Sequence, residues 1–408
     1  MKQKRVGMIL ILAVILVLAA CGKRVQEEEV VQNELQLWYY WDDTETRQCL
    51  LELIDAFNER HPEMMIVPKY VPDEDFKKTL ALAVADQEAP DLAIVDSSDV
   101  QYYDSMGVLK DTSRFVVEEK YLEPALASCR EPDGTYVGLP LGLNCLVFYY
   151  NEELLEQAGV PVPRTLDEFI EAAKRVSSAE VYGCAFPSLQ SEESSFCFLP
   201  ILWAKGGSIQ DINSRESQEA FDFLRQLIDS GAMSKSSVNM TLSDITREFA
   251  KGNLAMMFST SGKEKVIREA NPKLKFGVAE IPNGDRPISV IGGEVLTVTS
   301  MEHISDSMQF VAFMANQERI KSYIMKIGML SPRNDILQWQ VEQDPELKKY
   351  ASYLEHCRLR DMSPAWPPVS IAVSETINEI ILQTAKPEIL NDLAEAIQKI
   401  QEEQNEGK

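Results

Sequence analysis

The chain has 408 residues, with 64 acidic and 40 basic side chains and a formal net charge of −24 at pH 7. A protein this acidic repels phosphates and anionic lipid, so we expect it to bind neither nucleic acid nor a membrane surface directly. Its histidines, His61, His303 and His356, lie far apart without metal-ligand spacing. No metal site or cofactor is therefore predicted.

The first 20 residues predict an export signal. Lys2, Lys4 and Arg5 precede an apolar run over residues 8–20, which suits a signal peptide and is short for a membrane-spanning helix. The run ends in Leu-Ala-Ala-Cys-Gly at residues 18–22, which resembles the bacterial lipobox. That resemblance implies cleavage before Cys21 and a diacylglycerol on its sulfur. A plain signal peptide or an N-terminal anchor helix is the alternative.

The region after the signal divides into a tether and a large folded part. Residues 21–34 are polar and charged without apolar periodicity, which predicts a flexible tether. The folded part is long for one hydrophobic core and natural for two lobes. Six more cysteines are spread through it without a C-x-x-C pair. Disulfides are permitted outside the cytoplasm, but we expect mostly buried thiols.

The first hundred residues of the folded part alternate strands and helices. Apolar patterning predicts strands over 35–41, 64–71 and 92–95, a helix over 46–60, and a second helix over 73–85 with Asp73 as its cap. This order favours a parallel sheet with right-handed crossovers. Ligands of such sheets bind beyond the carboxyl ends of the strands, and this rule points to Trp41-Asp42-Asp43 and to Asp96-Ser97-Ser98.

The rest of the chain continues as α/β structure. An extended run over 143–151 leads into a helix from residue 152, and a further helix is predicted over 217–230. A strand over 254–259 precedes a helix that begins near residue 261. Another extended segment covers 289–299, and the part after about residue 345 reads as mostly helical.

Several motifs together resemble the family 1 extracellular solute-binding proteins, the group that contains maltose-binding protein. They are LWYYWD at 37–42, APDLAIVD at 89–96, GLP at 138–140, VFYYN at 147–151, PRTLDEF at 163–169, the segment 328–333, and the late Trp366. Leu166 stands where the family usually has tryptophan. The likeness extends over nearly the whole exported chain.

The resemblance implies an α/β, two-lobe periplasmic-binding-protein-like fold of type II, with the ligand cleft between lobes joined by hinge segments. The chain should cross between lobes near Asn144, Ile288 and Ser331. The lobes would then be residues 35–143 with 289–330, and residues 144–288 with 331–408. Hinge closure around a ligand is the motion usual for this class.

A sugar ligand calls for aromatic rings against its faces and planar polar groups at its hydroxyls. Strand ends, glycine-bearing turns and the family likeness together select ten candidate ligand-binding residues: Trp41, Asp42, Asp96, Asn144, Trp203, Ser261, Gly262, Glu294, Arg333 and Trp366. Each also has a purely structural alternative. The aromatic residues can be core, the polar residues can cap helices or turns, and Arg333 can form a surface salt bridge.

The function predicted from these features is that of a receptor of an ABC importer, binding a mono- or oligosaccharide. It would be a monomer, held on the outer face of the cell membrane by its lipid and partnered by permease subunits. No hydrolase, nucleotide-binding or metalloprotease motif is present, so no enzyme is predicted. Alternative interpretations are a polyamine or polyol phosphate receptor, a surface-anchored glycan hydrolase, and a sugar-sensing receptor subunit.

Overall fold

A computed structural model describes residues 33–406 of the chain. The predicted signal, Cys21 and nearly all of the predicted tether lie outside the described residues. Within residues 33–406 no helix combines the length and the apolar composition that a membrane crossing requires.

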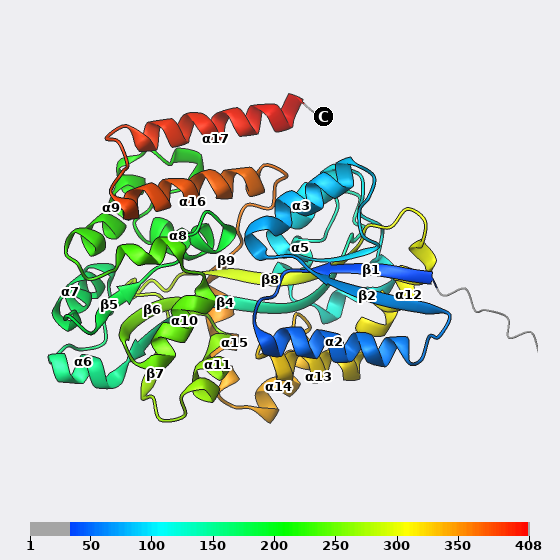
Figure 1. The fold of residues 1–408 in the computed structure, drawn as a ribbon, viewed down its shortest axis with the longest axis horizontal. Helices are drawn as coiled ribbons and strands as arrows, with labels where there is room; N and C mark the ends of the chain where they lie inside the picture. The colour runs from blue at the N-terminus through cyan, green and yellow to red at the C-terminus, as the bar shows by residue number, and fades with distance from the viewer. Residues whose placement is uncertain (1–32, 407–408) are drawn as a thin grey trace, which may run out of the picture.

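Within the described part of the chain, nine strands form one hydrogen-bonded system that runs through both lobes (Figure 1). The path is β2-β1-β3-β8-β4-β6-β5, with β7 paired to β4 and β9 paired to β8. The strands are β1 (Asn33–Tyr39), β2 (Met64–Tyr70), β3 (Leu92–Asp96), β4 (Leu139–Asn151), β5 (Tyr182–Ala185), β6 (Leu254–Thr260), β7 (Phe276–Ala279), β8 (Ser289–Val298) and β9 (Cys357–Arg358). The predicted parallel arrangement is confirmed for β1, β2 and β3, whereas β8 runs antiparallel to β3 and β4.

Helices cover this strand system in two groups. Around the first half lie α2 (Thr44–Asn58), α3 (Asp73–Ala85), α4 (Val100–Ser105), α5 (Glu123–Ala127), α12 (Ile304–Met314) and α13 (Gln317–Ile327). Around the second lie α6 (Glu152–Ala158), α7 (Leu166–Val176), α8 (Glu192–Ala204), α9 (Arg215–Asp229), α10 (Leu242–Lys251), α11 (Lys263–Ala270), α16 (Trp366–Leu382) and α17 (Ile389–Glu406). The helix α14 (Asn334–Gln343) contributes Ile336 to the core of the first half, and α15 (Leu347–Tyr353) contributes Tyr350 to a core cluster of the second half.

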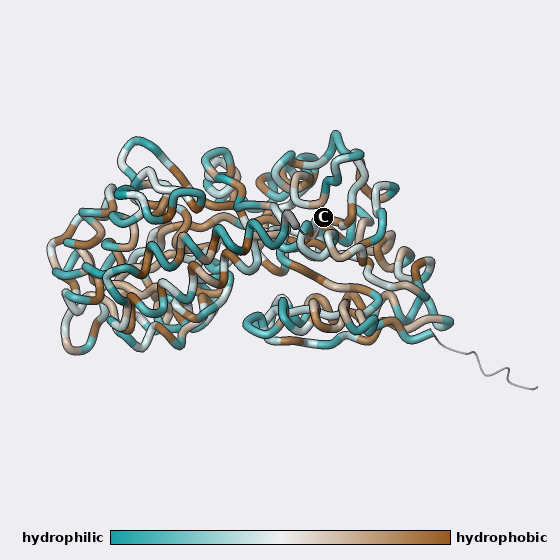
Figure 2. The backbone as a smooth tube through the Cα atoms, turned by 90° about the horizontal axis from the view of Figure 1, so that it is seen from above, coloured by the Kyte–Doolittle hydropathy of each residue, from teal (hydrophilic) through white to brown (hydrophobic). Residues whose placement is uncertain are grey.

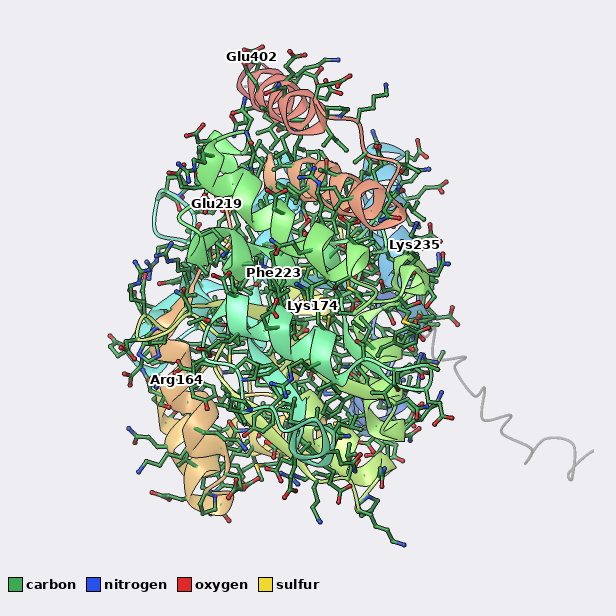
Figure 3. All side chains as sticks on the ribbon, turned by 90° about the vertical axis from the view of Figure 1, so that its left-hand side faces the viewer. Arg164, Lys174, Glu219, Phe223, Lys235 and Glu402 are labelled. Carbon is green, nitrogen blue, oxygen red and sulfur yellow. The ribbon has the colours of Figure 1, made fainter. Side chains whose placement is uncertain are left out.

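The hydrophobic core divides in the same way. One cluster of buried residues lies in the first lobe, and two lie mainly in the second, although the third also includes Ala125 of α5. Seen from above, hydrophobic stretches lie inside both lobes, and hydrophilic residues follow the outer helices and loops (Figure 2). In the second lobe Lys174 and Glu219 lie on the exposed faces of α7 and α9, while Phe223 packs against Phe169 at 5.8 Å between ring centroids (Figure 3).

Three segments pass from one core to another. In β4, Leu141 packs in the core of the first lobe and Leu143 in a core cluster of the second. In β8, Ile291 packs in that same second-lobe cluster and Val295 in the core of the first lobe. A third segment changes at Leu330, whose backbone exchanges hydrogen bonds with Leu143. Because β4 and β8 are paired through this region, the two longest crossings form a two-stranded ribbon at the base of the space between the lobes.

Local chemistry explains where the functional segments begin. The helix α3 covers the predicted residues 73–85, but its cap is Pro72, and Asp73 is the first helical residue without a capping hydrogen bond. The assignment of Asp73 as the cap was therefore wrong. Asp43 caps α2 by accepting a hydrogen bond from the Thr46 backbone N–H at 2.8 Å.

The expectation of mostly buried thiols is confirmed, because five of the six described cysteines are buried and all are free.

Candidate functional site

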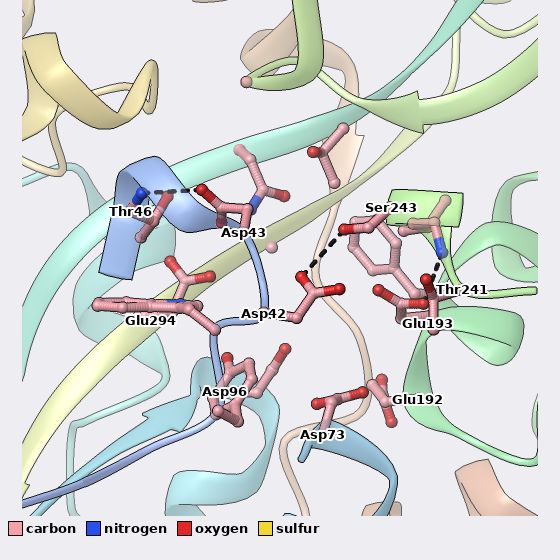
Figure 4. Close-up of a pocket in the computed structure, with 18 of the residues that line it drawn as sticks. Asp42, Asp43, Thr46, Asp73, Asp96, Glu192, Glu193, Thr241, Ser243 and Glu294 are labelled. Atoms are coloured by element: carbon pink, nitrogen blue, oxygen red, sulfur yellow. Dashed lines mark hydrogen bonds between the residues drawn. The ribbon is translucent and has the colours of Figure 1, made fainter. Parts of the chain in front are cut away.

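A cleft with a volume of about 330 Å³ lies between the two lobes. Its first-lobe wall consists of the loop after β1, the first turns of α2 and α3, and the end of β3. Its second-lobe wall consists of the first turns of α8, α10 and α11. The volume lies at the lower end of the range of about 300–1,000 Å³ that is typical of small-molecule sites. Figure 4 shows the side chains that converge on it.

The loop after β1 contributes an aromatic ring and a carboxylate. Trp41 borders the cleft but is only 7% exposed and packs in the core of the first lobe, with its centroid 6.3 Å from that of Tyr323. Asp42 is exposed, and one of its oxygens accepts a hydrogen bond of 3.0 Å from the hydroxyl of Ser243 on α10. This bond joins the two lobes across the cleft.

The floor of the cleft is built on the β4–β8 ribbon. Asn144 lies opposite Gly292 in the register of these strands. A Cβ atom at Gly292 would lie 2.5 Å from Asn144 Oδ1, so the missing side chain leaves room for the amide. Both Asn144 Oδ1 and Glu294 Oε2 are shielded from solvent and have no hydrogen-bond partner among the described residues. Two acceptors on the floor thus remain available to the donors of a ligand.

Glu294 is also electrostatically unusual. It is paired with Asp96 in the β3–β8 register, so two carboxylates lie side by side. Burial, together with the charge of Asp96, raises the pKa of Glu294 to about 8. Near neutral pH this carboxyl group therefore holds its proton for much of the time, unless a ligand supplies positive charge.

A buried network of charges connects the lobes along one side of the cleft. Arg360, which comes after β9, contacts Asp96 at 2.6 Å and Glu192 at 2.8 Å. Lys77 on α3 contacts the other oxygen of Glu192 at 3.0 Å and Asp99 at 2.9 Å. Because Glu192 and Arg360 belong to the second lobe and the other three to the first, the network holds the lobes against each other.

Glu192 is the centre of this network and is only 6% exposed. Burial alone would raise its pKa, but the charges of Lys77 and Arg360 outweigh that effect and hold it at about 2. The indole N–H of Trp366 and the hydroxyl of Ser370 also donate hydrogen bonds to its carboxylate. Glu192 therefore stays ionised throughout the physiological range.

Two other carboxylates face each other from opposite lobes. Asp73 is at the start of α3, and Glu193 is in the first turn of α8. Burial and the charge of Glu193 raise the pKa of Asp73 to about 8, and burial raises that of Glu193 to about 7. The backbone N–H of Leu242 donates to Glu193 at 2.8 Å and offsets part of this effect.

The structure brings six of the ten candidate residues together around the cleft: Trp41, Asp42, Asp96, Asn144, Gly262 and Glu294. They come from the ends of β1 and β3, from the β4–β8 ribbon, and from the turn before α11. Their roles in binding remain a proposal.

Four candidates lie elsewhere. Trp366 is fully buried in the core of the second lobe, so the expectation that its face stacks on a ligand is wrong. Trp203 packs on that same core near Arg358, outside the residues that line the cleft. The buried Ser261 accepts a hydrogen bond from the Cys145 backbone at 3.3 Å.

Arg333 forms a salt bridge of 2.7 Å with Asp335 and is also absent from the cleft lining. This is the salt-bridge alternative considered for it, although the guanidinium is largely buried and not at the surface.

The charged cleft residues that the sequence interpretation missed include Lys77, Glu192, Glu193 and Arg360. The sequence did contain a signal for the two glutamates. They are adjacent acidic residues just before the apolar run 196–202, and no basic residue lies beside them. Lys77 and Arg360 look like ordinary surface residues in the sequence. Their partners are far away along the chain, so local patterns do not reveal them.

Comparison with known proteins agrees with this architecture. Residues 52–351 match the family model described as bacterial extracellular solute-binding protein. The chain belongs to this family. It is also 22% identical over 368 residues to the melibiose/raffinose/stachyose-binding protein MelE of Bacillus subtilis, an alignment that covers 83% of this chain and 84% of MelE. The sn-glycerol-3-phosphate-binding periplasmic protein UgpB of Brucella abortus is 23% identical over 301 residues, covering 67% and 68% of the two chains.

Solved structures show the same fold. A solute-binding protein of Thermotoga lettingae with bound alpha-D-tagatose superposes with a TM-score of 0.82 at 20% identity, covering 90% of this chain and 99% of that one. T. maritima MalE3 with bound maltose gives a TM-score of 0.77 at 21% identity, covering 91% and 99%. The predicted two-lobe α/β fold of type II is thereby confirmed.

Proposed function

We propose that this protein is the extracytoplasmic receptor of an ABC importer and captures a small carbohydrate between its lobes. The observation that carries the proposal is the floor of the cleft, where the free acceptors of Asn144 and Glu294 lie on the hinge ribbon. Hydroxyl groups of a sugar would satisfy both acceptors, and the Trp41 ring would cover its C–H face. The names of the relatives, which include sugar-binding proteins, support the same ligand class.

The volume of the cleft favours a monosaccharide or a short oligosaccharide over a long one. In this proposal the moving units are residues 35–143 with 289–330, and residues 144–288 with 331–408. The protein acts as a monomer and delivers its ligand to permease subunits. It stays on the outer face of the membrane through a diacylglycerol on Cys21.

Binding without turnover is the property that separates this proposal from a glycan hydrolase. Isothermal titration calorimetry of the purified exported protein against a panel of mono- and disaccharides should give a saturable signal for at least one of them. The recovered sugar should be unchanged in mass spectrometry. Cleavage of the bound sugar would overturn the receptor assignment, and the absence of binding to every sugar in the panel would overturn the carbohydrate assignment.

A further inference from the structure

The cleft carries more negative charge than its own cations neutralise. Eleven carboxylate side chains and five lysine or arginine side chains line it. The interlobe network accounts for three of these carboxylates, and the pairs Glu45–Lys265 and Asp244–Arg247 account for two more. Within residues 33–406 no lysine or arginine lies in salt-bridge contact with the remaining six, which are Asp42, Asp43, Asp73, Glu74, Glu193 and Glu294. Glu294 holds its proton for much of the time near neutral pH. The fifth cation, Lys263, lowers the pKa of Glu193 without forming a salt bridge to it.

The uncompensated charge is placed between the lobes. Asp42 and Asp73 project from the first lobe and Glu193 from the second, and Figure 4 shows the three directed into one part of the cleft. Bringing Asp73 and Glu193 together opposes closure, because the charge of Glu193 raises the pKa of Asp73 and so the cost of ionising it. A cation placed between them would replace this repulsion with two favourable contacts.

A second observation indicates what kind of cation fits. Asn144 Oδ1 is a solvent-excluded acceptor without a partner among the described residues, and Glu294 Oε2 is a second one whenever that carboxyl group is ionised. The ligand must therefore present at least one hydrogen-bond donor to the floor. An ammonium group has three donors and no acceptor. The rings of Trp41 and Phe196 also line the cleft. The Arg360 guanidinium already lies over the Phe196 ring, 5.2 Å from its centroid, so Trp41 is the ring that remains for the C–H groups of an organic ligand or for a cation.

We infer that the ligand carries a protonated primary amino group, which Asp73 and Glu193 hold from opposite lobes. This inference rests on the proposed receptor function and makes its ligand class more specific. An amino sugar would supply the ammonium together with hydroxyl groups for the floor, and a linear polyamine would supply the ammonium alone. A ligand of either kind stabilises the closed arrangement, because it binds carboxylates that face each other only when the lobes are together.

Calorimetry with matched ligands tests the inference. The purified exported protein is titrated at pH 7.5 with D-glucosamine and D-galactosamine, with their neutral parent sugars and N-acetyl derivatives, and with putrescine and spermidine. At least one amine should bind at least tenfold more tightly than its uncharged counterpart. Asp73→Asn and Glu193→Gln should each remove most of that preference. Glu171→Gln, on the exposed face of α7, removes one surface charge and should leave the preference unchanged.

Each outcome of this experiment decides a separate point. Binding of polyamines without any amino sugar keeps the ammonium site and overturns the carbohydrate proposal. Equal binding of neutral and amine-bearing sugars overturns the ammonium site and leaves the carbohydrate proposal standing. Binding of no amine at all also overturns the ammonium site. If CaCl₂ raises the melting temperature of the wild type but of neither Asp73→Asn nor Glu193→Gln, the carboxylates bind a metal ion and the inference is overturned. Thermal melting of each variant confirms that the changes in affinity do not arise from unfolding.

Discussion

The carboxyl group of Glu294 lies on the floor of the cleft, opposite Asp96 in the β3–β8 register. Burial and the charges of Asp96 and Asp43 raise its pKa, the charge of Arg360 opposes them, and the result is about 8. In the unfolded chain a glutamate has a pKa of about 4.3. The folded protein therefore keeps a proton that the unfolded chain loses between these two values. The contribution of Glu294 to stability is present below about pH 4 and is lost as the pH rises toward 8.

Glu294→Gln should remove this dependence. We expect the variant to be more stable than the wild type at pH 8, on the order of 1 kcal/mol, and its free energy of unfolding to decline less between pH 5 and 8. Urea unfolding at a series of pH values measures both effects. Glu171→Gln should retain the wild-type profile. A Glu294→Gln profile parallel to that of the wild type would show that Glu294 is ionised in the folded protein at neutral pH.

The amide of Asn144 requires a residue without a side chain at position 292, which explains the glycine there. In Gly292→Ala the new methyl group would lie 2.5 Å from Asn144 Oδ1 and would force that side chain to turn away. We expect ligand affinity to fall by about tenfold or more, while stability changes by only about 1 kcal/mol, because the displaced atom is the end of a flexible side chain. The double variant Gly292→Ala, Asn144→Ala should bind no more weakly than Asn144→Ala alone. Additive losses would indicate that the backbone at Gly292 contacts the ligand independently.

At the scale of elements, the interlobe network joins α3, β3, α8 and the segment after β9. Replacing Arg360 with methionine leaves Asp96 and Glu192 without their shared guanidinium. Breaking a fully enclosed ion pair typically costs about 3–5 kcal/mol. We expect a smaller loss of about 1–3 kcal/mol here, because the lobes can part and hydrate the carboxylates.

Chemical denaturation measures this loss, and a surface pair provides the control. Arg164 and Asp285 form a salt bridge of 3.1 Å in which both side chains are largely exposed. Arg164→Met should therefore cost less than about 1 kcal/mol. Similar values for the two methionine variants would mean that the interlobe network contributes no more than an ordinary surface pair.

The elements also show how far the sequence alone can be interpreted. The strands and helices of the first lobe were predictable because each has strong apolar periodicity, and α3 occupies the predicted residues. In the sequence the prolines around Trp366 suggest a loop. In the structure Pro367 and Pro368 lie in the first turn of α16, where proline is well tolerated, and the helix carries Trp366 into the core.

Most of the charged residues of the cleft were not predictable, for a different reason. Trp41, Asp42 and Asp96 lie at or just after strand ends, and the rule that ligands bind beyond strand ends identified them. Arg360 and Lys77 instead both contact Glu192. These three residues come from the segment after β9, from α3 and from α8, which are far apart along the chain. No local pattern encodes that meeting, because it depends on how the lobes pack.

At the scale of the whole molecule, the proposed lipid on Cys21 determines where the receptor works. The wild type expressed in a bacterial host should partition with the membrane fraction, since two or more acyl chains give stable anchoring. Cys21→Ser should appear in the medium or as uncleaved precursor, because the acceptor sulfur is lost. Immunoblots of the fractions measure this partition. A processed Cys21→Ser protein that stays on the membrane would show that another feature anchors the chain.

Closure of the lobes is the motion that the proposed function requires. Asp42 bonds to Ser243, Lys77 to Glu192, and Arg360 to Asp96, and each of these contacts joins one lobe to the other. Opening the lobes returns the charged groups to water, so these contacts stabilise closure only modestly. The facing carboxylates of Asp73 and Glu193 oppose closure, and the balance between the two states is therefore open to control by a ligand.

A ligand that binds only the closed arrangement shifts this balance by its difference in affinity for the two states. Solution X-ray scattering should therefore show a smaller radius of gyration when a saturating ligand is added to the wild type. Lys77→Met with Arg360→Met removes the cations that join the lobes, so without ligand this variant should be more extended than the wild type. Ligand should still compact it, at a higher concentration, because closure then depends on ligand contacts alone. Equal radii for the two ligand-free proteins would show that the network does not bias the lobes toward closure.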